Sequence, residues 1–360
     1  MSQTLAQHRQ LGTSDVRVPP VIFGAWAIGG WMWGGSDEQD AVGAIRASID
    51  HGVNAIDTAA IYGQGNSEEI VGRALRGVPR DKVIIATKCG RRWDSAEGSD
   101  PWSTTDFHGK PITIRSNSRR ESIFYECEQS LKRLGTDYID LYQIHWPQRN
   151  VPMFGGTRFD PSKEKGGPAI REQVEGMAAM MAAGKIRHYG LSNETTWGVC
   201  EFHRVAKELG VPGPATLQNS YSLLSRNVDN DLAEALFREG MSLLAYSPLA
   251  GGLLTGKYLN GAKPKDARFT LFDSLGARFR KSIVPEAIDA YAALAKRRDL
   301  TLVQLALGYV ASRWFLGSSI IGATSMAQLK EDIAAAQITL DAETLREVED
   351  VLQRYPNPAP

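Results

Sequence analysis

The chain has 360 residues, of which 42% are hydrophobic and 23% charged, the usage of an ordinary globular protein that can bury a large core. Lys plus Arg and Asp plus Glu number 41 each, so the charge balance gives no reason to expect a nucleic acid as partner. The three cysteines do not suggest a disulfide framework, residues 1–17 lack the apolar core of a signal peptide, and no apolar run approaches about 18 residues, so we expect a cytoplasmic protein without a membrane span.

Short apolar runs rich in β-branched residues alternate along the chain with longer helical stretches. The expected strands are, in chain order, 21–23, 54–58, 83–88, 139–145, 186–192, 215–221, 242–247 and 318–323. The expected helices are 37–50, 67–76, 118–134, 169–183, 195–209, 231–239, 285–298, 301–313, 326–336 and 341–354. This alternation predicts a parallel sheet, and the lack of a clean polar–apolar alternation within the strands indicates burial on both faces.

The alternative to a barrel is a doubly wound sheet, which normally carries a G-x-G-x-x-G turn after its first strand. The first strand is instead followed by residues 24–30 (GAWAIGG), and the later turn at Gly63 and Gly65 has Glu68 where the third glycine belongs. Although a prior of about 150 residues per domain would allow two domains, no linker-like stretch divides the chain. We therefore predict one α/β domain over residues 1–360, folded as a (β/α)8 TIM barrel with long loops after strands 3, 4 and 7.

Two of these loops, residues 89–117 and 147–168, follow the third and fourth strands. Loops of this length in a compact domain are usually functional, and at the carboxyl ends of barrel strands they line a pocket. We expect an aromatic substrate pocket there, although the same side chains can also serve ordinary packing. Its expected tryptophans are Trp31, Trp33, Trp93 and Trp146, with Trp26 beside them.

Polar residues fall at the carboxyl ends of successive expected strands. These residues are Asp57, Lys88, His145, Ser192, Asn193, Gln218 and Tyr246. In a (β/α)8 barrel, the carboxyl ends of the strands converge on the face where chemistry is done. A single polar residue at a strand end is more often a solvated charge than a catalyst, but a run of them at successive strands indicates an active site.

Four of the polar residues make chemical sense together. A carbonyl that accepts a hydride becomes an alkoxide and needs a proton, but a free tyrosine, with a pKa of about 10, is a poor acid near neutral pH. The ammonium of Lys88 would stabilise the phenolate of Tyr62 and lower its pKa, and Asp57 would keep Lys88 protonated. His145 would donate a hydrogen bond to the substrate oxygen. Tyr62 would then be the general acid in reduction and the base in oxidation.

These stretches resemble the signatures of the aldo-keto reductase family. Residues 57–63 (DTAAIYG), 86–88 (ATK) and 141–147 (LYQIHWP) hold the four residues, and residues 130–140 (SLKRLGTDYID) are similar to the family's helix-to-strand signature. The resemblance is strongest toward the bacterial Tas-like branch. It implies NADPH-dependent, reversible reduction of aldehydes or ketones to alcohols, with Asp57, Tyr62, Lys88 and His145 as the catalytic residues.

The resemblance also implies where a nicotinamide cofactor, NADPH in preference to NADH, would bind. Tyr246 would stack on the nicotinamide ring. The other implied contacts are Ser192, Asn193 and Gln218 at the carboxamide; Ser247, Pro248, Leu249, Gly251, Gly252, Lys257 and Arg268 at the phosphates; and Gly322, Thr324, Gln328, Glu331 and Asp332 at the adenosine end. Trp26 is a further implied cofactor contact. Many relatives carry Arg or Lys where Thr324 or Gln328 stands, so Lys257 and Arg268 are the best cationic candidates for the phosphates. Barrel phosphate sites favour the loops after strands seven and eight.

Two other functions are possible for such a barrel. The family includes potassium-channel β subunits, which bind the cofactor but lack the catalytic His; a non-catalytic regulatory subunit is therefore the main alternative, and His145 argues against it. A hydrolase is not favoured, because no His-Glu-x-x-His or Gly-x-Ser-x-Gly pattern appears, and we expect no metal site.

Cys89, next to Lys88, is either a reactive thiol or a packing thiol, and we favour packing. The sequence identifies neither the carbonyl substrate nor the oligomeric state.

Overall fold

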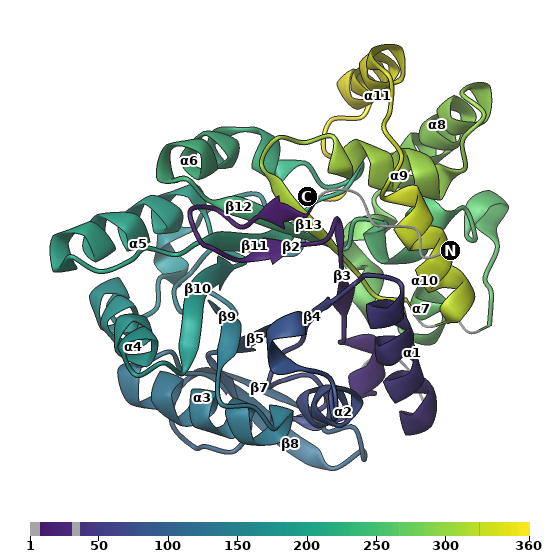
Figure 1. The fold of residues 1–360 in the computed structure, drawn as a ribbon. Helices are drawn as coiled ribbons and strands as arrows, with labels where there is room; N and C mark the ends of the chain where they lie inside the picture. Colours follow the sequence, from purple (N-terminus) through teal and green to yellow (C-terminus); the bar gives the residue numbers. More distant parts are fainter. Residues whose placement is uncertain (1–7, 31–36, 266, 324) are drawn as a thin grey trace.

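The computed structural model describes residues 8–30, 37–265, 267–323 and 325–360. Its main sheet is a closed barrel of parallel strands ringed by helices (Figure 1). The strands are ordered β10-β11-β12-β13-β3-β4-β5-β9 around the barrel, and their bounds are β3 (Val21–Gly24), β4 (Ala55–Asp57), β5 (Ile84–Cys89), β9 (Ile139–Ile144), β10 (Ile186–Ser192), β11 (Thr216–Ser220), β12 (Ser242–Tyr246) and β13 (Leu316–Ile321). The predicted (β/α)8 TIM barrel is confirmed.

The helices lie close to the expected ranges. They are α1 (Glu38–Asp50), α2 (Asn66–Ala74), α3 (Arg120–Leu134), α4 (Ile170–Ala182), α5 (Thr196–Leu209), α6 (Asp231–Glu239), α8 (Ile283–Arg297), α9 (Leu302–Ala311), α10 (Met326–Ala335) and α11 (Ala342–Arg354). Their ends follow local signals: Thr301 and Gln304 form a capping box at the start of α9, and Gly210 ends α5 in a left-handed conformation. None of the described helices is long and apolar enough to cross a membrane.

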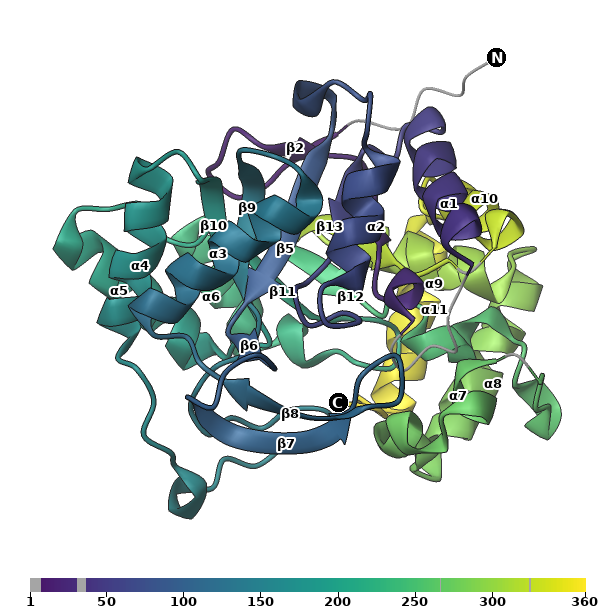
Figure 2. The ribbon, with the colours of Figure 1, turned by 90° about the horizontal axis from the view of Figure 1, so that it is seen from below.

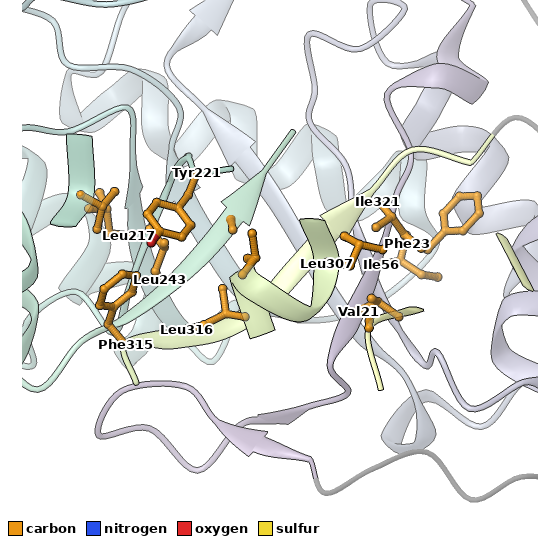
Figure 3. Packing of buried hydrophobic residues seen from close by; sticks show 14 of the residues in the cluster. Val21, Phe23, Ile56, Leu217, Tyr221, Leu243, Leu307, Phe315, Leu316 and Ile321 are labelled. Carbon is orange, nitrogen blue, oxygen red and sulfur yellow. The ribbon is translucent and has the colours of Figure 1, made fainter. Parts of the chain in front are cut away.

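Alternate residues of the barrel strands belong to two apolar layers. Val21 and Phe23 pack in the large layer that the strands share with the surrounding helices (Figure 3). Ile22, between them, belongs instead to a smaller cluster inside the barrel. The other members of this inner cluster are Ala55, Ala86, Leu141, Leu244 and Ile320 of the strands, and Leu11, Val16 and Val18 of an N-terminal hairpin.

This alternation decides which polar residues reach the mouth of the barrel. Successive residues of a strand point to opposite faces, so residues two positions apart point the same way. Asp57, Lys88, Gln143 and Tyr246 each stand two positions after a residue of the inner cluster. They therefore continue the inward-facing columns at the carboxyl ends of β4, β5, β9 and β12.

The two ends of the barrel are covered differently. The antiparallel hairpin of β1 (Arg9–Gln10) and β2 (Arg17–Val18) lies at one end, and an antiparallel sheet of β6 (Arg91–Arg92), β7 (Ser99–Thr105) and β8 (Pro111–Ser116) lies at the other (Figure 2). The long loop expected at residues 89–117 thus carries a sheet of its own. The loop after β12 carries the short helices η5 (Ala250–Thr255), η6 (Leu259–Gly261), α7 (Arg268–Leu271) and η7 (Asp273–Arg280), which the sequence did not predict.

Candidate active site

Asp57, Tyr62, Lys88 and His145 meet at the carboxyl end of the barrel. Lys88 Nζ lies 2.6 Å from Asp57 Oδ1 and 3.2 Å from the hydroxyl of Tyr62. It also donates to the carbonyl oxygen of Thr58 over 2.8 Å. An ammonium has three donors, and each of these contacts accepts one. The position of Nζ beside the Tyr62 hydroxyl is therefore fixed from three sides.

The second oxygen of Asp57 is held by two amides from β9 and β11, across the inside of the barrel. Gln218 Nε2 donates to Asp57 Oδ2 over 2.7 Å, and Gln143 Nε2 donates to the same oxygen over 3.2 Å. Gln218 Nε2 also lies 3.2 Å from Gln143 Oε1. The carboxylate, with 3% of its side chain exposed, therefore has hydrogen bonds on both oxygens. These bonds compensate for removing its charge from water.

Tyr62 is placed by the tight turn that follows β4. The turn contains Gly63, at φ 61°, and a Cβ there would lie 2.2 Å from the carbonyl oxygen of Gly29, so only glycine fits. The ring of Tyr62 stacks on Trp26 at a centroid distance of 5.6 Å and an interplanar angle of 19°. The ring also packs against the small apolar cluster of Ala59, Ile61 and Ile114. Packing on both sides thus holds the hydroxyl toward Lys88.

Burial and charge act in opposite directions on this pair. Burial raises the pKa of Tyr62 and outweighs the Lys88 ammonium, which lowers it. Lys88 therefore acts in the expected direction, but the net pKa of Tyr62 is above its ordinary value rather than below it. Burial lowers the pKa of Lys88, but Asp57 and Tyr62 outweigh it and leave the pKa raised. Lys88 is thus held as a cation beside a protonated phenol.

His145 stands edge-on to Tyr62, with ring centroids 5.7 Å apart and an interplanar angle of 80°. Only 8% of the residue is exposed. Burial, together with the charges of Lys88 and Arg91, holds the pKa of His145 well below its usual range. Its imidazole is therefore neutral near pH 7, with one nitrogen able to donate and the other able to accept.

The residues expected at the nicotinamide are close together beside this tetrad. The Tyr246 hydroxyl donates to Asn193 Oδ1 over 2.7 Å, and Asn193 Nδ2 donates to the carbonyl oxygen of His145 over 3.0 Å. Ser192 Oγ donates to the carbonyl oxygen of Gln218 over 2.9 Å. Gln218 itself, expected at the carboxamide, directs its amide nitrogen to Asp57.

Residues 247–252, immediately after β12, form a tightly wound segment. Ser247, Ala250, Gly251 and Gly252 all have positive φ, at 54°, 50°, 67° and 97°. A Cβ at Gly252 would lie 2.7 Å from Lys257 Cε, so glycine allows the lysine to pack directly over the backbone. Left-handed backbone at non-glycine residues is costly and is concentrated at functional sites.

Cations border this segment. The guanidinium of Arg268 lies 4.5 Å above the ring of Trp26, and burial together with Arg278 lowers the pKa of Arg268 to about 10. Within the segment, Pro248 and Leu249 follow Ser247, and Leu249 packs on the large apolar layer. Both expected phosphate-binding cations, Lys257 and Arg268, therefore lie close to the turn in which they were expected to act.

The expected adenosine end lies after β13. Gly322 is exposed, and a Cβ there would meet nothing within 4 Å among the described residues. Gln328 and Glu331 are exposed on α10, whereas Asp332 is buried. Burial and the charge of Glu331 raise the pKa of Asp332 to about 7, against the opposing charge of Lys257. Thr324 lies outside the described residues.

A model of the aldo/keto reductase family matches residues 20–353. The chain belongs to the aldo/keto reductase family. It is 37% identical over 363 residues to Protein tas of Escherichia coli (strain K12), with 98% of this chain and 100% of that protein covered. It is 35% identical to the NADH-specific methylglyoxal reductase of the same strain, with 96% and 98% covered. The solved structure of a glycerol dehydrogenase from Gluconobacter oxydans matches with a TM-score of 0.75 and 31% identity, covering 98% of this chain and 96% of that chain.

These matches confirm the family and the Tas-like branch that the sequence motifs indicated. As an aldo/keto reductase, the chain is an oxidoreductase that uses a nicotinamide cofactor and acts on small carbonyl compounds. The comparisons leave open which of the two nicotinamide cofactors it uses, since one relative is named as NADH-specific.

The tryptophans expected in the substrate pocket of this aldo/keto reductase differ in their placement. Trp146 lies edge-on to His145, with ring centroids 6.0 Å apart, and contacts Phe154 at 5.4 Å. Trp93 packs against the apolar cluster behind Tyr62, so it supports the turn that holds Tyr62. Trp31 and Trp33 lie outside the described residues.

Three residues near the reductase site were not identified from the sequence. Gln143 binds Asp57; its signal was a lone polar residue in the inward-facing register of a buried strand. Arg91 packs on Trp146, and Arg278 comes from η7 with its charge near Tyr246. Both arginines lie in short elements, β6 and η7, of the long connections after β5 and β12, where the sequence shows no clear periodicity. Cys89 is buried, and burial raises the pKa of its thiol well above the usual range, which supports a packing role.

A hollow of about 770 Å³ on the side of the barrel is a separate feature. It lies between α2 and α3, and none of the residues expected in the site lines it. Its arginines include Arg80, which is paired with Asp140, and Arg133, which is paired with Glu68. These cations are therefore already compensated within the protein.

Proposed function

We propose that the protein reduces aldehydes or ketones to alcohols with NADPH, reversibly, using Tyr62 as the proton donor. The observation that carries the proposal is the position of Lys88 Nζ, which is 2.6 Å from Asp57 Oδ1 and 3.2 Å from the Tyr62 hydroxyl. This arrangement suits a proton donor that must become a transient anion, since the adjacent ammonium stabilises the phenolate when the proton leaves.

The bound cofactor would supply the hydride that the carbonyl carbon accepts. Tyr62, protonated because of its raised pKa, would pass its proton to the carbonyl oxygen as negative charge develops there. His145, neutral near pH 7, would orient that oxygen by donating a hydrogen bond. Asp57 would keep Lys88 charged throughout the reaction, and in alcohol oxidation the same groups would act in reverse.

The charge and the backbone conformation of the residues after β12 support binding of a dinucleotide there. Lys257 and Arg268 supply positive charge beside the segment of positive φ at residues 247–252. Tyr246 and Asn193 place a ring and an amide next to His145. We assign Lys257 and Arg268 to the cofactor phosphates and Tyr246 to the nicotinamide ring. The preference for NADPH rests on these cations, because NADPH carries one phosphate more than NADH.

A panel of aldehydes and ketones assayed with NADPH and with NADH tests this proposal. We expect oxidation of NADPH that depends on the carbonyl compound and is faster than oxidation of NADH at equal concentration. Tight binding of NADPH without reduction of any carbonyl would instead support the alternative, a non-catalytic cofactor-binding subunit. Faster turnover with NADH would overturn the cofactor assignment while leaving the carbonyl reduction in place.

A further inference from the structure

The arginine just beyond the end of β5, Arg91, is buried without a carboxylate paired to it among the described residues. Arg91 stands three residues after Lys88 and is 9% exposed. Arg80, Arg149 and Arg226 are each paired with a carboxylate. Among the described residues, Arg91 has no carboxylate within 4.0 Å. Burying a charge without a counter-charge is costly, so such a residue needs an explanation.

The guanidinium of Arg91 is oriented but not saturated. Its plane lies over the ring of Trp146, with Cζ 3.8 Å from the ring centroid, and Nη1 donates to Ser116 Oγ over 2.6 Å. A guanidinium has five N–H donors. In the part of the chain that the structure describes, this bond to Ser116 is its only hydrogen bond. The remaining donors are therefore available to a ligand.

The support around Arg91 is rigid. Ser116 pairs with Arg91 across β6 and β8. Gln148 Nε2 donates to the carbonyl oxygen of Ser116 over 2.9 Å, and Gln148 Oε1 accepts from the backbone nitrogen of Ser118 over 2.6 Å. The loop after β9 and the sheet across the barrel mouth thus hold the guanidinium in one place, as a binding residue requires.

The charge of Arg91 lies next to the reacting groups. Trp146, on which it stacks, is edge-on to His145 at 6.0 Å. Arg91 is also close enough for its charge to lower the pKa of the His145 imidazole. The acidic side chain whose charge acts on Arg91 is Asp100, which accepts a hydrogen bond from Lys165. Arg91 therefore places a positive charge beside His145 that no described carboxylate pairs with directly.

We propose that Arg91 determines substrate specificity by binding an anionic group, a carboxylate or a phosphate, attached to the carbonyl compound that the enzyme reduces. The planar fork of a guanidinium matches either oxyanion through two parallel N–H···O bonds. The stack on Trp146 leaves the edge of the guanidinium for this contact. The inference rests on the proposed carbonyl reduction.

Arg92 offers a matched control on the same strand. Successive strand residues point to opposite faces, and Arg92 Nε binds Asp94 Oδ1 over 2.9 Å while its guanidinium lies over Tyr125. Arg92 is thus an arginine of the same strand whose charge is compensated by Asp94 on the opposite face. Replacing it removes one positive charge without touching the proposed binding site.

The test compares matched pairs of neutral and anionic carbonyl compounds. Butanal and 4-oxobutanoate differ by a carboxylate, and glyceraldehyde and glyceraldehyde 3-phosphate differ by a phosphate. We expect the wild type to favour the anionic member of at least one pair, and the pair that shows the preference identifies the anion. In Arg91→Met, the ratio of kcat/KM for the anionic member to that for the neutral member should fall by about 10- to 150-fold, the range for losing one charge-assisted contact. Arg92→Met should leave that ratio within about twofold.

Several results would overturn the inference. If the wild type shows no anion preference in either pair, or if Arg91→Met lowers kcat/KM equally for both members, Arg91 only supports Trp146 and β8. Arg91→Lys keeps the charge but loses the fork, so it should retain part of the preference. Failure of the wild type to reduce any of the four compounds would count against the proposed function. In that case, a titration of tryptophan fluorescence with succinate and with inorganic phosphate tests the Arg91 site directly. Binding to the wild type that is lost in Arg91→Met supports the site. No binding to the wild type, or equal binding to Arg91→Met, overturns it.

Discussion

The ammonium of Lys88 and the carboxylate of Asp57 form an ion pair of 2.6 Å in which neither side chain is more than 3% exposed. A buried pair of this kind adds little net stability, because removing two charges from water costs about as much as their attraction returns. Its effect here is positional, since it holds a cation 3.2 Å from the hydroxyl of Tyr62.

Replacing Lys88 with methionine should leave Asp57 as an unpaired buried charge. We expect a loss of about 3–5 kcal/mol in the free energy of unfolding. We also expect kcat/KM at neutral pH to fall by about 10²- to 10⁴-fold. The double variant Asp57→Asn/Lys88→Met should recover stability but not activity, which separates the two effects in thermal unfolding and in rate measurements. Lys82→Met, at an exposed lysine, is the control. An unchanged pH–rate profile in Lys88→Met would rule out Lys88 as the group that assists Tyr62.

Arg268→Ala tests how the cofactor phosphates are bound. If Arg268 contacts the 2′-phosphate, the affinity for NADPH should fall by about 10- to 150-fold and that for NADH should barely change. If both affinities fall equally, Arg268 contacts the shared pyrophosphate instead. Quenching of protein fluorescence measures both, and no change in either affinity would remove Arg268 from the cofactor site.

The raised pKa of Asp332 predicts that the preference for NADPH over NADH depends on pH. Its pKa is raised to about 7, so the carboxyl group is mostly neutral below that pH and mostly charged above it. If a 2′-phosphate binds nearby, NADPH affinity should fall relative to NADH affinity as the pH rises through 7, by roughly fivefold for about 1 kcal/mol of repulsion. Asp332→Asn should abolish this trend, and Glu331→Gln, at the exposed neighbour, should largely keep it. A trend that persists in Asp332→Asn would show that another group is responsible.

Much of the barrel could be predicted because buried parallel strands appear in the sequence as apolar runs. Asp57 and Lys88 were identifiable for the same reason: each ends such a run with a charge. The sheet in residues 89–117 was missed because β7 (Ser99–Thr105) is polar and largely exposed, so it lacks the apolar spacing of a strand.

The sequence also could not predict how burial balances charge. The ammonium of Lys88 lowers the pKa of Tyr62 as expected, but the packing of Trp26 and the turn at residues 59–65 bury the phenol enough to reverse the net effect. The sequence could not identify Arg91, because its distinguishing feature is that no carboxylate among the described residues pairs with it. Only the positions of surrounding carboxylates, which come from distant parts of the chain, reveal that its charge is uncompensated.

The most direct test of the account is Tyr62→Phe, which keeps the ring that stacks on Trp26 and removes only the hydroxyl beside Lys88. The measurement is the rate of carbonyl-dependent NADPH oxidation together with the dissociation constant of NADPH for the same preparation. We predict that kcat/KM falls by at least about 10²-fold while the dissociation constant stays within about twofold of the wild type. Carbonyl reduction by Tyr62→Phe at the wild-type rate would contradict the assignment of Tyr62 as the proton donor.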